Sequence, residues 1–458
     1  MSDDKRDAFG TQPLGQLLRK QAVPASAGIL VMSIYGIVDT LFVGLWVGSL
    51  GIGAITVVLP ISFLIASIGM AIGIGGASVI SRAFGAGDDE KAYHTFGNQM
   101  GMTFTLSVVF MAAGFLFMDS ILSLFGGRGD VAEFARTYFG IILLGVPFLA
   151  WAMMSNNVIR AEGHPRTAML IIMIPAVVNI ILDPILIVYL DMGLAGAAWA
   201  TTLSYMCSAV FATWFFLRGK SRMKLRAEYL RPDPTIVREV SSLGAVSFAR
   251  QGTITLLSLV LNNSLFIYGG EMGLSIYGII NRLLMFANFP VIGITQGFVP
   301  ICGYNYGARL MKRVRRLTRM AITSAVLISL GIFTIIMTMA PHIVSIFTNN
   351  QELIEQTTPA LRWVFLGIPL IGINLIGSAY FQAIGKARPA LVLALAKQGI
   401  LLIPLVLMLP LVFGINGIWY AFPLADLGAA LITLVFFRYM GKKQEYPVEA
   451  KTEAVAGN

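Results

Sequence analysis

Long apolar runs fill most of this chain and leave it few ways to fold. Each run has about 20 residues or more, enough to cross a hydrocarbon core of about 30 Å as a helix. Because no water reaches the backbone N–H and C=O groups there, each run must satisfy them internally as an α-helix. The strands of a membrane barrel would be shorter and would alternate polar with apolar residues. The sequence therefore predicts an all-α integral membrane protein.

The pattern of apolar runs repeats in the two halves of the chain. Leu144–Pro147 recurs as Leu366–Pro369, and Gly163 recurs as Gly385, at an interval of 222 residues. Six spans fall in each half, which supports the count more than hydropathy alone. The twelve predicted spans are residues 20–45, 53–78, 95–118, 133–159, 167–190, 194–217, 240–267, 273–299, 318–341, 356–382, 389–412 and 416–438. Repeats of this kind are typical of transporters, in which they form the two sides of a moving pathway.

Polar segments divide the chain between and around these spans. The longest internal one carries seven Lys and Arg residues from Arg218 to Arg238, with Pro232 and Pro234 as helix breakers. The predicted parts are a cytoplasmic N-terminal segment (1–19), an N-lobe (20–217), a cytoplasmic linker (218–239), a C-lobe (240–438) and a cytoplasmic tail (439–458). The architecture is thus two pseudo-symmetric lobes of six transmembrane helices.

The placement of the basic residues explains the net charge of +10. Of the 33 Lys and Arg residues, 27 fall at the termini or in the loops after the even-numbered spans. By the positive-inside rule, both termini lie in the cytoplasm. The charge therefore reflects topology and contact with anionic lipid headgroups, and not nucleic-acid binding.

Motifs for catalysis or metal binding are missing from the sequence. Cys207 and Cys302 have neither metal-ligand spacing nor a disulfide framework, and the three histidines are scattered. The sequence also lacks a Walker loop, a G-x-S-x-G elbow and an HExxH motif. We therefore expect no enzymatic activity, no ATP-driven pump, no resident metal and no cofactor.

Three polar residues of the first half are predicted to lie at one depth in the membrane, with a fourth one turn deeper. Asp39 and Asp183 each precede the outer end of an outward-running span by six or seven residues, and Thr201 follows the start of the next span by about seven. At about 1.5 Å per residue, these side chains lie roughly 10 Å in from the outer face. Asn179, four residues before Asp183, shares its helix face.

Two carboxylates, an amide oxygen and a hydroxyl are ligands for a hard cation, and they could equally hold a proton. Ionised groups at this depth are costly, which marks them as functional candidates. The alternative is that Asp39 and Asp183 only hydrogen-bond across helices, with Asn179 and Thr201 as partners.

These motifs resemble the multidrug and toxic compound extrusion (MATE) family over residues 12–440. The resemblance rests on the order and spacing of Asn179-Ile-Ile-Leu-Asp183-Pro184, Gly196-Ala-Ala-Trp-Ala200-Thr201, Val38-Asp39-Thr40, Arg160-Ala161-x-Gly163 and Gly303-Tyr304-Asn305-Tyr306-Gly307-Ala308. It implies two six-helix lobes forming a V in a bacterial or archaeal plasma membrane. It also implies antiport, in which inward Na+ or H+ drives export of drugs or metabolites, often organic cations.

The resemblance further implies a cation site at Asp39, Asn179, Asp183 and Thr201, with Asn157 in span 4 as an additional candidate. Pro24 in span 1 is the expected hinge. One branch of the family has an acid in span 7, where this chain has Asn262 and Asn263. A second cation site built on that acid is therefore not expected here, and we expect a monomer in contact with lipid.

The second half instead places Arg250, Arg282, Lys397 and Asp426 within spans. Pairing of Asp426 with Lys397 or Arg250 would neutralise part of this charge. Alternatively, the C-lobe cations bind an anionic substrate group or hold the lobes together. A lipid-linked oligosaccharide or polysaccharide flippase of the same superfamily is therefore the main alternative to a multidrug antiporter, and a membrane-embedded enzyme lacks any supporting motif.

Overall fold

The computed structural model describes residues 8–219, 221–223 and 226–444. Residues 1–7 of the predicted N-terminal segment, residues 220 and 224–225 of the predicted linker, and residues 445–458 of the predicted tail lie outside that part. Within those ranges every element of regular secondary structure is a helix, and there is no strand.

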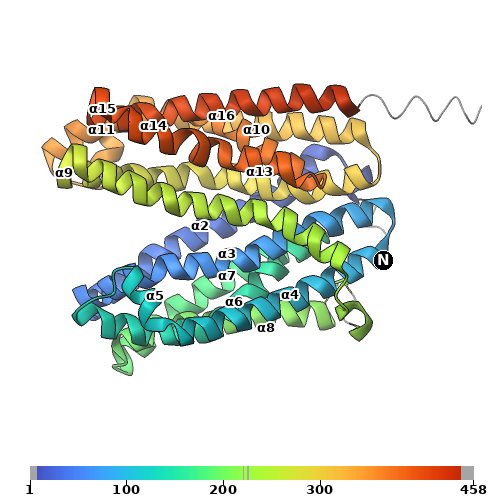
Figure 1. Cartoon of the computed structure of the whole chain (residues 1–458), viewed down its shortest axis with the longest axis horizontal. Coiled ribbons are helices and arrows are strands. Elements are labelled where there is room, and N and C mark those ends of the chain that lie inside the picture. Colours follow the sequence, from blue (N-terminus) through green and yellow to red (C-terminus); the bar gives the residue numbers. More distant parts are fainter. Residues whose placement is uncertain (1–7, 220, 224–225, 445–458) are drawn as a thin grey trace, which may run out of the picture. The chain divides into compact units, whose positions relative to one another are not determined.

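Helices follow one another with short connections along the whole described chain (Figure 1). The first half contains α1 (Ala8–Thr11), α2 (Leu14–Trp46), α3 (Ser49–Ala86), α4 (Asp89–Leu116), α5 (Met118–Leu124), α6 (Asp130–Ala161), α7 (Pro165–Asp183), the π-helical segment η2 (Pro184–Tyr189), α8 (Gly193–Arg218) and the 3-10 turn η3 (Ala227–Leu230). The second half contains α9 (Pro234–Gly307), α10 (Met311–Ser345), α11 (Gln351–Phe365), α12 (Ile368–Ala383), α13 (Ala387–Leu395), the π-helical segment η4 (Ala396–Leu402), α14 (Ile403–Met408), α15 (Pro410–Phe413) and α16 (Ile415–Gln444).

These helices account for the twelve predicted spans. Within the described chain, nine helices are long and apolar enough to cross a membrane, and the α11–α12 pair, bent by 42°, makes a tenth. α9 holds two predicted spans, because Gly270 has a left-handed φ of 58° that breaks the helix. α2 has 33 residues and covers the first predicted span.

Two helices extend beyond their predicted boundaries. Asp233 accepts hydrogen bonds from the backbone N–H groups of Thr235 and Ile236, so α9 begins at Pro234, inside the predicted linker. α16 continues to Gln444, so the predicted tail begins as helix.

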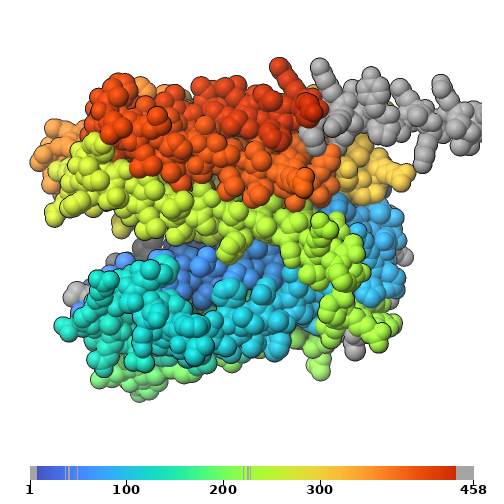
Figure 2. Space-filling model, viewed as in Figure 1, coloured from blue at the N-terminus to red at the C-terminus, as the bar shows by residue number. Residues whose placement is uncertain are grey.

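The chain forms two compact units that do not follow chain order. Unit 1 comprises residues 1–252, 292–321 and 382–387, and unit 2 comprises residues 253–291, 322–381 and 388–458. A core of unit 1 forms around Val58, Phe139 and Leu143, and unit 2 has its core around Leu261 and Phe365. On the face drawn in Figure 2, side chains fill the space between the ribbons of α14 and α16 in unit 2.

Two equivalent hydrogen bonds, one in each half, show the repeat directly. The amide of Asn156 donates to the carbonyl of Ala168 in the first half. The hydroxyl of Ser378 donates to the carbonyl of Ala390 in the second half at 3.0 Å. Both donors and both acceptors are separated by the repeat interval, so the two halves share an internal scaffold as well as motifs.

Candidate functional site

The end of α7 brings Asp183 to a local change of helix geometry. Pro184 follows it directly and opens the π-helical segment η2. Proline has no N–H to donate and its ring disturbs the preceding turn, so regular α-helical bonding cannot continue there. π-helical turns are frequent at functional sites. The carboxylate of Asp183 is fully buried at this point.

Asn179 joins α7 to α8 beside that carboxylate. Its Nδ2 donates to Oδ2 of Asp183 at 2.7 Å, and its Oδ1 accepts from the backbone N–H and the hydroxyl of Thr201, each at 3.2 Å. Asn179 is fully buried, and Thr201 is 5% exposed. The structure therefore brings together the three predicted residues of spans 5 and 6.

Asp39 of α2 completes this group. Its carboxyl lies next to the carboxyl of Asp183. Two carboxyls this close repel each other while both are ionised, so a proton or a cation between them would relieve the repulsion. The Oδ1 atom of Asp39 is buried without a hydrogen-bond partner in the described chain. An orphaned carboxylate oxygen beside a second carboxyl, an amide and a hydroxyl suits a proton or a hard monovalent cation. We call Asp39, Asn179, Asp183 and Thr201 the acid centre.

Three tyrosines surround the acid centre, and the sequence did not assign them to it. Tyr35, Tyr138 and Tyr205 lie close enough to Asp39 to interact with it electrostatically, and Tyr35 and Tyr138 also lie next to Thr201. Helical spacing could have found two of them, since Tyr35 precedes Asp39 by four residues and Tyr205 follows Thr201 by four. Tyr138 comes from α6, and no spacing links it to the others.

Two other predicted residues lie elsewhere in α6 and α2. The amide of Asn157 donates to the carbonyl of Met153 in its own helix at 2.9 Å and packs against Gly73 of α3. These contacts do not join it to the acid centre. Pro24 lies within α2, which continues through it, so its role as a hinge stays a prediction.

Unit 2 holds a different polar group on the matching helices. Nζ of Lys397, in η4, lies 2.6 Å from Oδ1 of Asp426, in α16. The Lys397 side chain is 20% exposed and that of Asp426 is 2% exposed. Gly367 makes room for the pair, because a Cβ there would lie 2.6 Å from Cβ of Asp426. The sequence left open whether Asp426 pairs with Lys397 or with Arg250, and the structure pairs it with Lys397. We call Lys397 and Asp426 the ion-pair centre.

The two remaining C-lobe cations do not belong to the ion-pair centre. Arg250 is half-buried in α9, on the unit 1 side of the division between units, and Arg282 is exposed further along the same helix. Asn262 and Asn263 are exposed as well.

Outside the membrane spans, one acid has a strongly shifted pKa. Burial raises the pKa of Glu162, just after α6, to about 7. Hydrogen bonds oppose that shift: its Oε1 accepts from the backbone N–H groups of Arg222 and Met223 at 2.9 and 3.1 Å, and from the Ser221 hydroxyl at 2.9 Å. Glu162 thus fastens the beginning of the predicted linker to α6.

Known proteins match this chain over nearly its whole length. The MatE family model matches residues 24–185 and 247–408, one match in each half. Multidrug export protein MepA of Staphylococcus aureus (strain NCTC 8325 / PS 47) is 27% identical over 435 residues, covering 95% of this chain and 96% of its own. The protein of that name from Staphylococcus saprophyticus is 29% identical over 436 residues, with the same coverage.

Solved structures agree with the fold. A MATE crystal structure in the bent conformation has a TM-score of 0.90 at 23% identity, covering 95% of this chain and 97% of that one. A MOP superfamily transporter from Pyrococcus furiosus Vc1 (DSM3638) has a TM-score of 0.89 at 24% identity, covering 94% and 97%. This likeness confirms the predicted all-α, two-lobed membrane fold with twelve transmembrane helices. The family match in both halves shows that the chain belongs to the multidrug and toxic compound extrusion (MATE) family of membrane transporters.

Proposed function

We propose that this chain exports amphipathic, often cationic, small molecules in exchange for Na+ or H+. The relatives that match it over most of its length are named multidrug export proteins. Export against a gradient needs an energy source, and the sequence has no nucleotide-binding motif. An ion gradient is therefore the source that we propose.

The observation that carries this proposal is the carboxyl pair of the acid centre. The carboxyls of Asp39 and Asp183 lie next to each other, and Oδ1 of Asp39 has no hydrogen-bond partner among the described residues. Burying two carboxyls costs free energy unless a proton or cation neutralises them. The state of this pair therefore depends on the ions that reach it.

Coupling then follows from a difference in ion affinity between conformations. A cation entering from outside would neutralise the acid centre, rearrange α2 near Pro24 and favour release of cargo. An ion shifts a conformational equilibrium only by its differential affinity for the two states. A tenfold to hundredfold difference supplies about 1.4–2.7 kcal/mol per ion.

The proposed orientation places both termini in the cytoplasm of a bacterial or archaeal cell, in the plasma (inner) membrane. The distribution of Lys and Arg supports it, because 27 of 33 lie at the termini or in the loops on one side of the predicted topology. We expect the transporter to work as a monomer in contact with lipid.

A flippase for lipid-linked sugars is less well supported. Its anionic pyrophosphate would need free cations, and the ammonium of Lys397 is already paired with Asp426 at 2.6 Å. The carboxyl pair of the acid centre would also repel such a cargo.

Ethidium transport by inside-out vesicles tests the proposal. A Na+ gradient and a pH gradient are imposed separately, each directed out of the vesicle lumen, which corresponds to the cell exterior. We expect one of them to drive ethidium into the lumen, and dissipation of that gradient by an ionophore to stop it. Transport driven by neither gradient would contradict the proposal and favour the flippase.

A further inference from the structure

One end of unit 1 is held together by contacts between the two halves of the sequence. The ends of α3 and α9, the starts of α4, α9 and α10, the segment α1 and residues 382–387 all contribute to it, and all belong to unit 1. By the proposed orientation, this end faces the cytoplasm. Two clusters of polar contacts fasten it.

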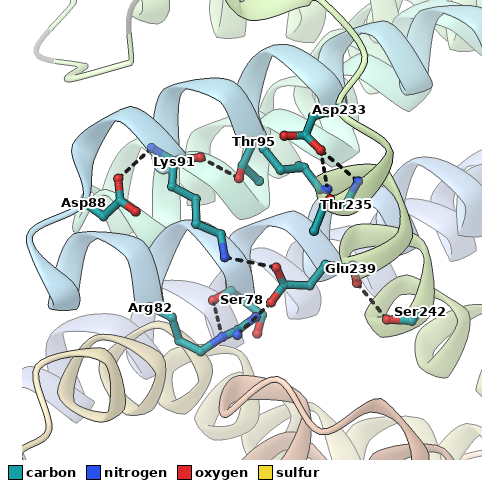
Figure 3. A network of polar contacts seen from close by, with 10 residues as sticks. Ser78, Arg82, Asp88, Lys91, Thr95, Asp233, Thr235, Glu239 and Ser242 are labelled. Carbon is teal, nitrogen blue, oxygen red and sulfur yellow. Dashed lines mark hydrogen bonds and ion pairs between the residues drawn. The ribbon is translucent and has the colours of Figure 1, made fainter.

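The first cluster, which we call the Glu239 clasp, is ionic (Figure 3). One carboxylate oxygen of Glu239 in α9 lies 2.9 Å from Nη1 of Arg82 in α3, and the other lies 3.2 Å from Nζ of Lys91 in α4. Arg82 also donates from Nε to the carbonyl of Ser78 at 3.2 Å. The clasp therefore joins two helices of the first half to the start of the second half.

The turn between α12 and α13 packs against the Glu239 clasp. The hydroxyl of Ser78 donates to the carbonyl of Gln382 at 2.6 Å, and the amide of Gln382 donates to the carbonyl of Leu243 at 2.9 Å. Gly385 has a φ of 81°, and a Cβ there would lie 2.4 Å from Nη1 of Arg82. Only glycine allows the turn to lie this close to the guanidinium.

The second cluster, which we call the Arg313 clasp, holds the N-terminal segment. The guanidinium of Arg313 in α10 donates to the carbonyls of Phe9 and Gln12 at 3.2 and 2.7 Å, and to Oδ1 of Asn305 at 3.0 Å. The amide of Asn305 also donates to the carbonyl of Phe9 at 2.9 Å. The ring of Phe9 is 7% exposed and packs edge-on against Tyr304. α1 is thus fixed to the end of α9.

The two clasps are related by the internal repeat. Lys91 and Arg313 are each the third residue of their helix and are separated by the repeat interval. Each reaches the segment that leads into the opposite half of the chain. Between the clasps, α3 and α9 cross at equivalent glycines: a Cβ on Gly85 would lie 2.0 Å from the carbonyl oxygen of Tyr304, and one on Gly307 would lie 2.1 Å from that of Arg82.

The clasps differ in how well water reaches them. In the Glu239 clasp the side chains of Arg82, Glu239 and Lys91 are 17%, 25% and 42% exposed. Ion pairs at such sites are screened and contribute little. The Arg313 clasp combines charge-assisted hydrogen bonds with the fully buried Asn305 and the buried Phe9, so breaking it leaves buried polar groups unpaired.

We propose that the two clasps together form a gate that keeps the cytoplasmic end of unit 1 closed, with α1 as its latch. α9 cannot separate from α1, α3 and α4 at this end while both clasps hold. The Arg313 clasp sets most of the barrier, and the Glu239 clasp adds a smaller part. This proposal rests on the proposed orientation but not on the identity of the cargo or of the coupling ion.

The native cysteine Cys302 provides a reporter of opening. It is fully buried at the end of α9, next to Gly303, which packs on Ser81 of α3. In a Cys207→Ser background, a membrane-impermeant maleimide is added to inside-out vesicles, and the rate of Cys302 modification is followed by mass shift. Right-side-out vesicles are treated in parallel, and faster labelling in them would show that this end faces the cell exterior instead. The labelling itself requires no transport activity, so it does not depend on the proposed function.

We expect Arg313→Gln and deletion of residues 2–12 to accelerate Cys302 labelling by about tenfold or more. Glu239→Gln should accelerate it by about threefold. Lys312→Gln, an exposed neighbour of Arg313, and Ser242→Ala, whose hydroxyl bonds only within α9, are matched controls that should leave the rate unchanged. Arg313→Lys, which keeps the charge with fewer donors, should give an intermediate rate.

Thermal unfolding of each variant separates opening from loss of structure. Faster labelling in Arg313→Gln with a melting temperature close to that of Lys312→Gln supports the gate. Labelling of Cys302 at the same rate in Arg313→Gln, the deletion variant and Lys312→Gln would overturn it.

Discussion

The acid centre of unit 1 and the ion-pair centre of unit 2 lie on matching helices but neutralise their buried charge in different ways. In the acid centre, the carboxyls of Asp39 and Asp183 lie next to each other and have no basic partner among their described contacts. In the ion-pair centre, Asp426 meets the ammonium of Lys397 at 2.6 Å. By our proposal the first half takes a cation or proton from solution, whereas Asp426 of the second half is paired with a lysine of the protein itself.

This difference arises on a helix scaffold that the two halves of the chain share. The hydrogen bonds from Asn156 to Ala168 and from Ser378 to Ala390 are equivalent in the two halves. Gly145 and Gly367 are equivalent too: a Cβ on Gly145 would lie 3.2 Å from Oγ1 of Thr202 in α8, and Gly367 packs on Asp426 in α16. The two halves thus share places where their helices meet, and they differ in a few side chains at those places.

The strongest test of this comparison is Asp183→Asn. The amide keeps the shape but removes the charge, so we expect ion-driven ethidium transport to be abolished while the protein remains folded. Initial transport rates under the driving gradient measure the effect. Asp191→Asn changes an exposed acid eight residues further on and should transport normally. Normal transport by Asp183→Asn would remove the functional distinction between the two centres.

In unit 2, Lys397→Met should act on stability. It leaves the carboxylate of Asp426 buried without its cation, which costs up to about 3–5 kcal/mol of unfolding free energy. The double variant Lys397→Met/Asp426→Asn should recover most of this loss, because neutral groups can replace a buried ion pair. Thermal unfolding of purified protein measures both. We also expect the double variant to keep ion-driven transport within about threefold of that of the original protein. A loss of ion-driven transport in the double variant would show that the ion-pair centre also senses ions.

Much of the acid centre could be predicted from the sequence. Helical rise places Asp39, Asp183 and Thr201 at one depth, and helical period places Asn179 on the face of Asp183. The bonds among Asn179, Asp183 and Thr201 agree with that prediction. Depth alone could not show that the two carboxyls touch or that Tyr138 joins them, because those contacts depend on how α2 and α6 are rotated. For the same reason, the sequence left the partner of Asp426 open between Lys397 and Arg250.

Glu162→Gln tests a pH dependence of stability that comes from neither the acid centre nor the ion-pair centre. Removing it makes the comparison of the two centres cleaner. The pKa of Glu162 is raised from 4.5 to about 7, so the folded protein keeps a proton that the unfolded chain releases between these values. The free energy of unfolding therefore falls as pH rises from 4.5 to 7 and is constant above that range. We expect Glu162→Gln to remove a change in the free energy of unfolding on the order of 1–3 kcal/mol across this pH range. The melting temperatures of both proteins, followed from pH 5 to 8, measure the effect. Parallel curves for the two proteins would contradict the assignment.

The smallest expected effect is that of Tyr138→Phe. The repeat places Ala360 at the equivalent position, so the tyrosine hydroxyl is a feature of the first half alone. The hydroxyl lies next to Thr201, which bonds to Asn179, and its loss should cost about 1 kcal/mol, or a few-fold in the apparent affinity for the driving ion. The ring stays, so packing around the buried side chain is preserved. Ethidium transport as a function of ion concentration measures the change, with the exposed Tyr189→Phe as the control. If the ion dependence is unchanged, the tyrosine hydroxyl takes no part in ion binding. The functional difference between the two halves would then lie in the carboxyl, amide and threonine groups of the acid centre alone.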